Sequence, residues 1–318
     1  MTAPPAGDAG VAARQSVDGM PGDAAPRIRG RLAPQSMFPA GVPGYRVRFI
    51  ELRGSERVRV VEIGDRDALP AVFLPGWGCP VWDFHRTMPA VADAGFRAVA
   101  IDLRGHGLSD MPTDPARYGT DAMVSQVIDL LDAVGVQRVA LVGHSMGGAL
   151  ATNLALRLPD RVRALALFAP IGFGNARIAA LGRLLSPSWT IPFARLVLQP
   201  ALIALGLRAL YGNNERVDRR NVDEYWAQSQ FDGFVPAMRA LLHEFRWTRF
   251  TDEEIAGLSL PGLLVRGRRD PIVLRPWSPT SLPPRWRELV LEGVGHLPHD
   301  ESPEVVNSAL IAMLNDLR

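Results

Sequence analysis

Residues 138–158 read RVALVGHSMGGALATNLALRL. Residues 139–142 are a short apolar run that favours a strand, and residues 148–158 are typical of a helix. Between them, Gly143-His144-Ser145-Met146-Gly147 matches the G-x-S-x-G pattern, in which a serine occupies a sharp turn from a strand to a helix. Small residues flank this serine because a Cβ on either side would clash, and the strained turn exposes its hydroxyl. A phosphate-binding turn is the alternative, but that turn needs further glycines and often a lysine.

The chain on both sides of this turn alternates short apolar runs with longer amphipathic stretches. Runs rich in Val, Ala, Leu and Ile suit parallel strands covered on both faces, and their alternation with helices predicts a three-layer α/β sheet. One clear helix is expected from Thr120, which can cap it, to Gly135, which stops it, and the last helix is expected to begin at Ser302 and Pro303. Eight strands are predicted, at residues 45–52, 57–63, 70–74, 97–101, 138–142, 162–168, 262–266 and 287–291.

Two segments depart from this alternation. Residues 1–44 are rich in Pro, Gly and Ala and lack a hydrophobic period, which predicts a flexible tail because such a segment buries too little apolar area to offset its ordering entropy. Residues 171–250 contain apolar stretches with helical character but no convincing buried strand. We therefore expect a core of residues 45–170 and 251–318, interrupted by a helical cap at residues 171–250.

Composition excludes several classes of protein. All 35 basic residues are Arg and face 33 acidic residues, so the net charge of +2 predicts no strong attraction to nucleic acid or to anionic membranes. The absence of Lys excludes Schiff-base chemistry, catalysis with covalently bound pyridoxal phosphate and P-loop NTPases. The single cysteine, Cys79, excludes internal disulfides, Cys-rich zinc modules and iron–sulfur sites. No apolar run is long enough to span a bilayer, and we expect a cytoplasmic protein without metal or cofactor.

Three other stretches accompany the serine turn. They are Leu74-Pro75-Gly76-Trp77-Gly78, residues 102–109 (DLRGHGLS), and Gly295-His296 followed by Glu301 and Pro303. In this order the four motifs resemble the α/β-hydrolase family, in particular its cap-bearing serine esterase and lipase-like branch, over about residues 45–318. The resemblance implies an eight-stranded, mostly parallel sheet with a helical cap insertion and a Ser–Asp–His catalytic triad.

A serine nucleophile needs a hydrogen-bonded base, and the chain order serine, acid, histidine requires a late histidine. His296 follows a short loop after the last predicted strand and matches the Gly-His step of the family, whereas His299 is the less favoured alternative. A zinc site at these two histidines lacks partner ligands at helical spacing. Asp270 follows the strand at residues 262–266, where the family places the acid that orients the base. The alternative for Asp270 is a surface carboxylate paired with a neighbouring arginine.

The oxyanion that develops during attack on an ester carbonyl needs hydrogen-bond donors already in place. One expected donor is the backbone N–H of Met146, at the start of the helix that follows the serine turn (the nucleophile elbow). The other is the backbone N–H of Trp77. The family usually has His-Gly where this chain has Pro75-Gly76. The contacts that hold the loop with Trp77 in place are therefore expected to differ from those of the family. The Trp77 side chain either lines the acyl pocket or packs.

The predicted cap is strongly apolar. No acidic residue occurs between Asp160 and Glu215, and we expect the cap to act as a lid that selects apolar groups. Most of its apolar side chains are expected to pack on the core. The candidates that line the substrate pocket are Trp189, Ile191, Phe193 and Val197.

The leading hypothesis is a serine hydrolase that cleaves carboxylic esters of apolar small molecules through an acyl-enzyme. Carbon–carbon bond hydrolysis of the meta-cleavage type is an alternative, although those enzymes often have Asn where this chain has His144. Perhydrolase or acyltransferase activity could use the same triad, and a non-enzymatic ligand receptor is disfavoured by the complete Ser145, Asp270 and His296 set. Epoxide hydrolases and haloalkane dehalogenases are disfavoured because their elbow carries Asp at the position of Ser145.

Overall fold

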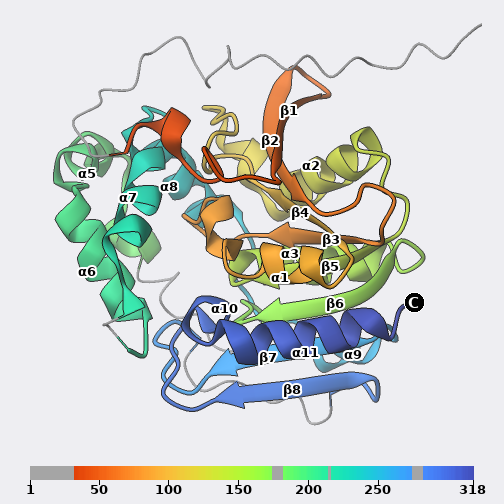
Figure 1. The fold of residues 1–318 in the computed structure, drawn as a ribbon. Coiled ribbons are helices and arrows are strands. Elements are labelled where there is room, and N and C mark those ends of the chain that lie inside the picture. The colour runs from red at the N-terminus through yellow and green to blue at the C-terminus, as the bar shows by residue number, and fades with distance from the viewer. Residues whose placement is uncertain (1–31, 174–181, 214–215, 274–281) are drawn as a thin grey trace, which may run out of the picture.

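The computed structural model describes residues 32–173, 182–213, 216–273 and 282–318. Eight strands form one sheet in the order β1-β2-β4-β3-β5-β6-β7-β8 (Figure 1). The pairs β1–β2 and β2–β4 are antiparallel, and the other pairs are parallel. The predicted eight-stranded, mostly parallel sheet is confirmed. The strands are β1 (Arg46–Leu52), β2 (Glu56–Ile63), β3 (Pro70–Leu74), β4 (Arg97–Ile101), β5 (Val139–His144), β6 (Val162–Phe168), β7 (Gly262–Gly267) and β8 (Trp286–Leu291).

Helices cover both faces of the sheet because the strand side chains alternate between two apolar clusters. On β3, Val72 belongs to the cluster that includes α2 (Thr120–Ala133) and α3 (Met146–Arg157). Its neighbour Phe73 belongs to the cluster on the other face, with α1 (Met88–Asp93) and α11 (Pro303–Asn315) (Figure 1). The other short helices are η1 (Pro34–Ser36) before β1, η2 (Val81–Phe84), η3 (Pro115–Tyr118) and α9 (Asp252–Ala256) between strands, and α10 (Pro298–Glu301) after β8.

The ends of α2 lie close to the predicted positions, but the expected cap differs. Gly119 occupies the N-cap position of α2, and the Thr120 hydroxyl instead accepts a hydrogen bond from the backbone N–H of Arg246 at 2.8 Å. Gly135 follows the end of the helix with a φ of 71°, a conformation that glycine adopts without steric penalty.

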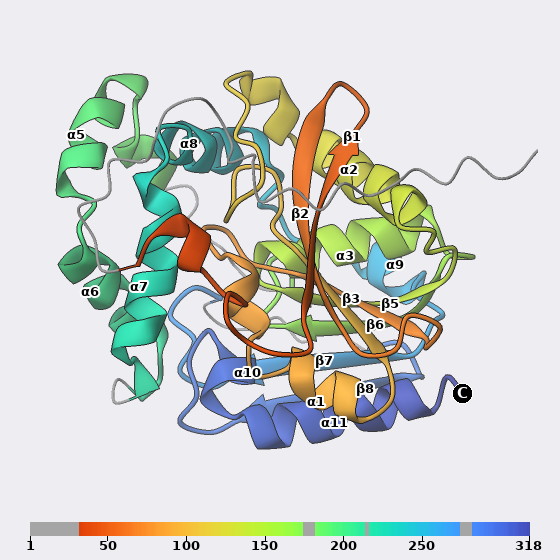
Figure 2. The same cartoon turned by 45° about the horizontal axis from the view of Figure 1, so that its top comes forward.

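The chain between β6 and β7 is helical over most of its described residues. It contains η4 (Ser188–Thr190), α5 (Ile191–Val197), α6 (Pro200–Leu210), α7 (Arg219–Ala227), η6 (Gln228–Gln230) and α8 (Phe234–Glu244). Figures 1 and 2 show α5, α6 and α7 at the end of the sheet toward which the arrows of β6, β7 and β8 point. Within the described ranges, none of the helices combines the length and the apolar character needed to cross a bilayer.

The prediction of a flexible tail at residues 1–44 is wrong for residues 32–39. Residues 1–31 lie outside the described part of the chain. Residues 32–39 pack against the rest of the protein, where Leu32, Met37 and Phe38 are buried, whereas residues 40–44 are exposed. The backbone N–H of Phe38 donates to Glu224 at 2.8 Å, and the Arg59 guanidinium donates to the Phe38 carbonyl. The prediction used the average composition of residues 1–44, in which these few apolar side chains carry little weight. Their burial and the hydrogen bonds of the segment offset the entropy lost when it is ordered.

Candidate active site

Ser145 lies on the tight turn between β5 and α3, as the motif predicts. It adopts a φ of 51°, which is unusual for a residue other than glycine, and its backbone N–H donates to the Phe168 carbonyl at 2.9 Å. A Cβ added to Gly143 or Gly147 would lie under 3.0 Å from backbone atoms, which for Gly147 belong to the carbonyl groups of Leu74 and Pro75. The motif therefore holds Ser145 in a strained conformation that its close-packed neighbours maintain.

Three side chains from separate loops form a hydrogen-bonded chain. Ser145 Oγ lies 2.9 Å from His296 Nε2, and His296 Nδ1 lies 2.8 Å from Asp270 Oδ2. The other carboxylate oxygen of Asp270 accepts the backbone N–H groups of Ile272 at 2.7 Å and Val273 at 3.0 Å. The structure thus brings together all three residues of the predicted triad.

The carboxyl of Asp270 is held in its ionised form. Burial raises its pKa, but the charge of His296 and the hydrogen bonds from His296, Val273 and Ile272 outweigh burial and lower the pKa below the ordinary value. Since an ionised carboxylate can only accept, His296 Nδ1 carries a proton, and in the neutral imidazole this leaves the lone pair of His296 Nε2 facing the Ser145 hydroxyl. This tautomer is the one in which the imidazole can take a proton from the serine.

The loop that carries His296 is tied to the end of α6. The His296 N–H donates to the Leu210 carbonyl at 2.8 Å. Glu301 accepts the N–H groups of Gly295 and Gly212, each at 2.8 Å. A Cβ added to Gly212 or Gly295 would lie under 3.0 Å from backbone of the opposing segment, so the two backbones are in direct contact.

The loop at residues 75–80 lies directly beside the serine. A Cβ added to Gly76 would lie 3.2 Å from Ser145 Cβ. Gly76 N–H donates to Asp83 at 3.3 Å and Gly78 N–H donates to His106 Nε2 at 3.0 Å. Among the described residues, neither the Trp77 N–H nor the Met146 N–H, the two predicted oxyanion donors, has a hydrogen-bond partner in the protein.

His106 supports this loop as a neutral imidazole. Its Nδ1 lies 3.0 Å from the Arg104 carbonyl, which leaves Nε2 to accept from Gly78. Burial lowers the pKa of His106 to about 4. His106 therefore has a structural role at this loop.

Asp83 is the site residue that sequence reasoning missed. It is buried on η2, where one of its oxygens lies 2.8 Å from His144 Nδ1 and the other lies 3.3 Å from His299 Nε2. His299, the alternative base, therefore faces Asp83, and the hydrogen-bonded partner of the Ser145 hydroxyl is His296. The only sequence signal for Asp83 is a lone acidic residue within the apolar Val81–Phe84 stretch, soon after the glycine loop.

Cys79 is buried beside Asp83 and His144, and their ligand atoms lie within 4.8 Å of one another. Burial raises the pKa of the Cys79 thiol well above its ordinary value, so the group is held as a thiol, which is a poor metal ligand. Because His144 and Asp83 already pair with each other, the hydrogen bonds of the cluster satisfy these two groups without a metal.

The predicted pocket residues are mostly exposed. Trp189, Phe193 and Val197 are 70%, 61% and 61% exposed, and Ile191 is half-buried. Trp189 and Phe193 pack edge to face with ring centroids 6.4 Å apart. The indole N–H of Trp77 donates to the Met238 carbonyl at 3.0 Å, so this side chain bridges to α8. The role of Trp189, Ile191, Phe193 and Val197 in substrate binding stays a prediction.

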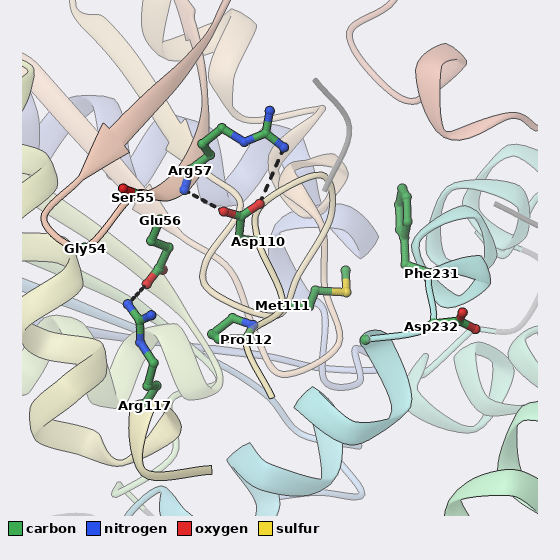
Figure 3. Close-up of a pocket in the computed structure, with 11 residues that line it drawn as sticks. Gly54, Ser55, Glu56, Arg57, Asp110, Met111, Pro112, Arg117, Phe231 and Asp232 are labelled. Atoms are coloured by element: carbon green, nitrogen blue, oxygen red, sulfur yellow. Dashed lines mark hydrogen bonds and ion pairs between the residues drawn. The ribbon is translucent and has the colours of Figure 1, made fainter. Parts of the chain in front are cut away.

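A cavity of about 410 Å³ lies elsewhere, between the β1–β2 turn and the start of α8 (Figure 3). Ion pairs join Arg57 to Asp110 and Glu56 to Arg117 along its wall (Figure 3). None of the triad residues lines this cavity, so it is separate from the candidate active site.

A sheet of this topology, with a serine elbow at the end of β5 and a histidine loop after β8, defines the class of α/β hydrolases. The chain belongs to the alpha/beta hydrolase family, whose model matches residues 71–309.

Individual relatives have different activities. The chain is 30% identical to the dihydrolipoyllysine-residue acetyltransferase component of the acetoin cleaving system of Pseudomonas putida, over 82% of this chain and 67% of that protein. It is 28% identical to epoxide hydrolase A of Mycobacterium tuberculosis, over 85% and 97%. The solved structure of the meta-cleavage product hydrolase CumD from Pseudomonas fluorescens matches with a TM-score of 0.73 at 21% identity, over 85% of this chain and 98% of that one. The last likeness shows the fold alone.

Proposed function

We propose that this protein is a serine hydrolase that cleaves carboxylic esters of apolar small molecules through an acyl-enzyme intermediate. The observation that carries the proposal is the continuous chain from Ser145 Oγ to His296 at 2.9 Å and from His296 to Asp270 at 2.8 Å. Nucleophile, base and orienting acid in this order are the arrangement that acyl transfer requires.

The proposed reaction proceeds in two halves. Ser145 Oγ attacks the ester carbonyl carbon while its proton passes to His296 Nε2, and the backbone N–H groups of Met146 and Trp77 stabilise the oxyanion. Collapse of this intermediate expels the alcohol, which takes the proton from His296. Water then attacks the acyl group, again losing its proton to His296, and the acid is released as Ser145 is restored. The negative charge of Asp270 stabilises the imidazolium in both halves.

The identity of the elbow residue argues against an epoxide hydrolase, even though such enzymes are among the relatives. Those enzymes carry Asp at the position of Ser145, and a serine there favours acyl chemistry instead. Carbon–carbon bond hydrolysis of the meta-cleavage type and perhydrolase or acyltransferase activity use the same triad and remain the alternatives to be tested.

Labelling with a fluorophosphonate tests the nucleophile. We expect stoichiometric modification at Ser145 in the wild-type protein and none in Ser145→Ala. Turnover of p-nitrophenyl esters beside a vinylogous diketone then separates the two reactions. Labelling at another residue, or turnover of the diketone alone, would contradict the ester hydrolase proposal.

We also propose that residues 171–250 form a cap that selects apolar acyl or alcohol groups. Each methylene group buried in an apolar pocket contributes about 0.8 kcal/mol at best, which is roughly a fourfold gain in kcat/KM. The kcat/KM of p-nitrophenyl esters should therefore rise from acetate toward medium acyl chains. A flat or falling series from acetate to hexanoate would exclude an apolar pocket.

A further inference from the structure

His144 and Asp83 make a buried contact beneath the candidate triad. The His144 ring is nearly inaccessible to solvent, and each of its nitrogens has a partner. Nδ1 lies 2.8 Å from Asp83 Oδ2, and Nε2 lies 3.0 Å from the backbone carbonyl of His296. Because a carbonyl oxygen can only accept, His144 Nε2 must carry a proton. The protonation state of His144 therefore depends on whether Asp83 is ionised.

The surroundings of Asp83 favour the ionised form. Its Oδ2 accepts from the Gly76 N–H at 3.3 Å and lies 2.8 Å from His144 Nδ1, and its Oδ1 accepts from the Tyr225 hydroxyl at 3.3 Å and lies 3.3 Å from His299 Nε2. An ionised carboxylate has the capacity to accept at all four contacts. A buried charge of this kind persists only when it is paired and hydrogen-bonded, and here both conditions are met.

The pKa values of the two groups shift in the directions that this arrangement implies. Burial raises the pKa of Asp83, but the neighbouring His144 and His299 outweigh burial and lower it well below the ordinary value. Burial lowers the pKa of His144, but the charge and the hydrogen bond of Asp83 outweigh burial and raise it.

The same two side chains touch three of the loops that the proposed reaction uses. Asp83 binds Gly76, the residue before Trp77, whose N–H is the proposed oxyanion donor. His144 directly precedes Ser145 in the chain and binds the carbonyl of His296. The rings of His144 and His296 lie 5.1 Å apart, so the position of His144 limits the position of the base.

We infer that Asp83 and His144 form a buried carboxylate–imidazolium pair. This pair fixes the loop at residues 75–80 and the loop that carries His296 in position relative to Ser145. The inference rests on the proposed function for its catalytic consequence. Both are positioning residues, since neither contacts the reacting atoms. Removing the charge of Asp83 allows His144 to lose a proton. The amide in Asp83→Asn then satisfies either the Gly76 N–H or both hydrogen bonds of His144, but not all three, because Gly76 and His144 share one oxygen of Asp83.

The first test reads the protonation state directly and needs no substrate. In protein labelled with ¹⁵N at histidine, both ring nitrogens of His144 should give imidazolium shifts at neutral pH, with the signals assigned by their loss in His144→Gln. In Asp83→Asn, these signals should change to those of a neutral ring. A neutral His144 ring in the wild-type protein would overturn the inference, whether or not the protein hydrolyses esters.

The second test measures catalysis. Asp83→Asn should lower kcat for a p-nitrophenyl ester by roughly 10–100-fold with little change in KM, because misplacement of catalytic groups acts on the chemical step. Asp110→Asn is the matched control, because Asp110 also accepts a backbone N–H, from Arg57 at 2.8 Å, but lies outside the site. We expect the control to retain wild-type kcat.

A double-variant cycle distinguishes a paired unit from two independent residues. If the pair acts as a unit, Asp83→Asn combined with His144→Gln should lower kcat no further than the worse single variant. Multiplicative losses, or wild-type kcat in Asp83→Asn, would refute the inference. Should the wild-type protein fail to label with fluorophosphonate, the proposed function fails, while the histidine spectra still decide the charge state of the pair.

Discussion

Replacement of Asp270 by Asn is the sharpest test of the triad, because the structure dictates how the new amide must sit. The Oδ1 atom of Asp270 accepts two backbone N–H groups, from Ile272 and Val273. The amide oxygen of Asn has to stay at this position, since turning the NH₂ group toward two donors would leave both backbone N–H groups unsatisfied. Each unsatisfied buried group costs about 1–3 kcal/mol, so the reversed orientation is disfavoured by roughly 2–6 kcal/mol.

With the amide oxygen fixed there, the NH₂ group faces His296 Nδ1. It donates to this nitrogen and thereby forces the proton onto His296 Nε2, which can then no longer accept the proton of Ser145. The tautomer in which His296 Nε2 can accept a proton requires the reversed amide orientation, which is disfavoured by roughly 2–6 kcal/mol. At 1.36 kcal/mol for each factor of ten, this lowers the rate by between about 30-fold and 10⁴-fold. Loss of the charge that stabilises the imidazolium adds to this, so we expect kcat to fall by about 10³–10⁴-fold.

The assay is steady-state hydrolysis of a p-nitrophenyl ester, with a thermal melt to establish that the variant is folded. KM should change far less than kcat, because Asp270 is proposed to act in the transition state. A kcat for Asp270→Asn within tenfold of the wild-type value, in a folded protein, would refute the assignment of the acid and require another carboxylate.

Ser145→Ala and His296→Ala should each lower kcat by about 10⁴-fold or more while leaving the melting temperature near the wild-type value; residual turnover above that level would point to a different nucleophile or base. Gly147→Ala should destabilise the protein by about 1–3 kcal/mol in urea unfolding, because the new Cβ overlaps a backbone carbonyl, whereas Gly206→Ala, with nothing within 4 Å in a helix, should stabilise it by about 0.5–1 kcal/mol. The lowered pKa of Asp270 means that its contribution to folding is present above the ordinary value of 3.8 and is lost as pH falls through the folded value. Urea unfolding from pH 5 downward should show this loss in the wild-type protein and a smaller one in Asp270→Asn; equal slopes would count against the ionised pair.

The sheet and the triad could be predicted from sequence because their signals are local. The central strands β3, β5 and β6 contain continuous apolar runs, and Ser145, Asp270 and His296 follow β5, β7 and β8 within a few residues. Geometry at the end of a parallel sheet then brings the three together without further information. The elbow glycines carry an equally local signal, since the close approach of backbone at Gly147 admits no side chain.

Asp83 could not be predicted because its role depends on contacts with distant parts of the chain. Its partners His144 and His299 lie 61 and 216 positions away, and neither separation leaves a pattern in the sequence. The packing of residues 32–39 escaped prediction for a similar reason. A few apolar side chains there, such as Met37 and Phe38, find a surface built by the rest of the protein.

The contact between the end of α6 and the histidine loop limits how the helices beside the site can open. Leu210 accepts from the His296 N–H, and Glu301 accepts from both Gly212 and Gly295, so the end of α6 is tied to the loop that carries His296. A displacement of α6 that kept these bonds would have to bend the chain on the α5 side of Leu210, and one that broke them would release the loop that holds His296 beside Ser145. The same hydrogen bonds therefore link the position of α6 to the position of the proposed base.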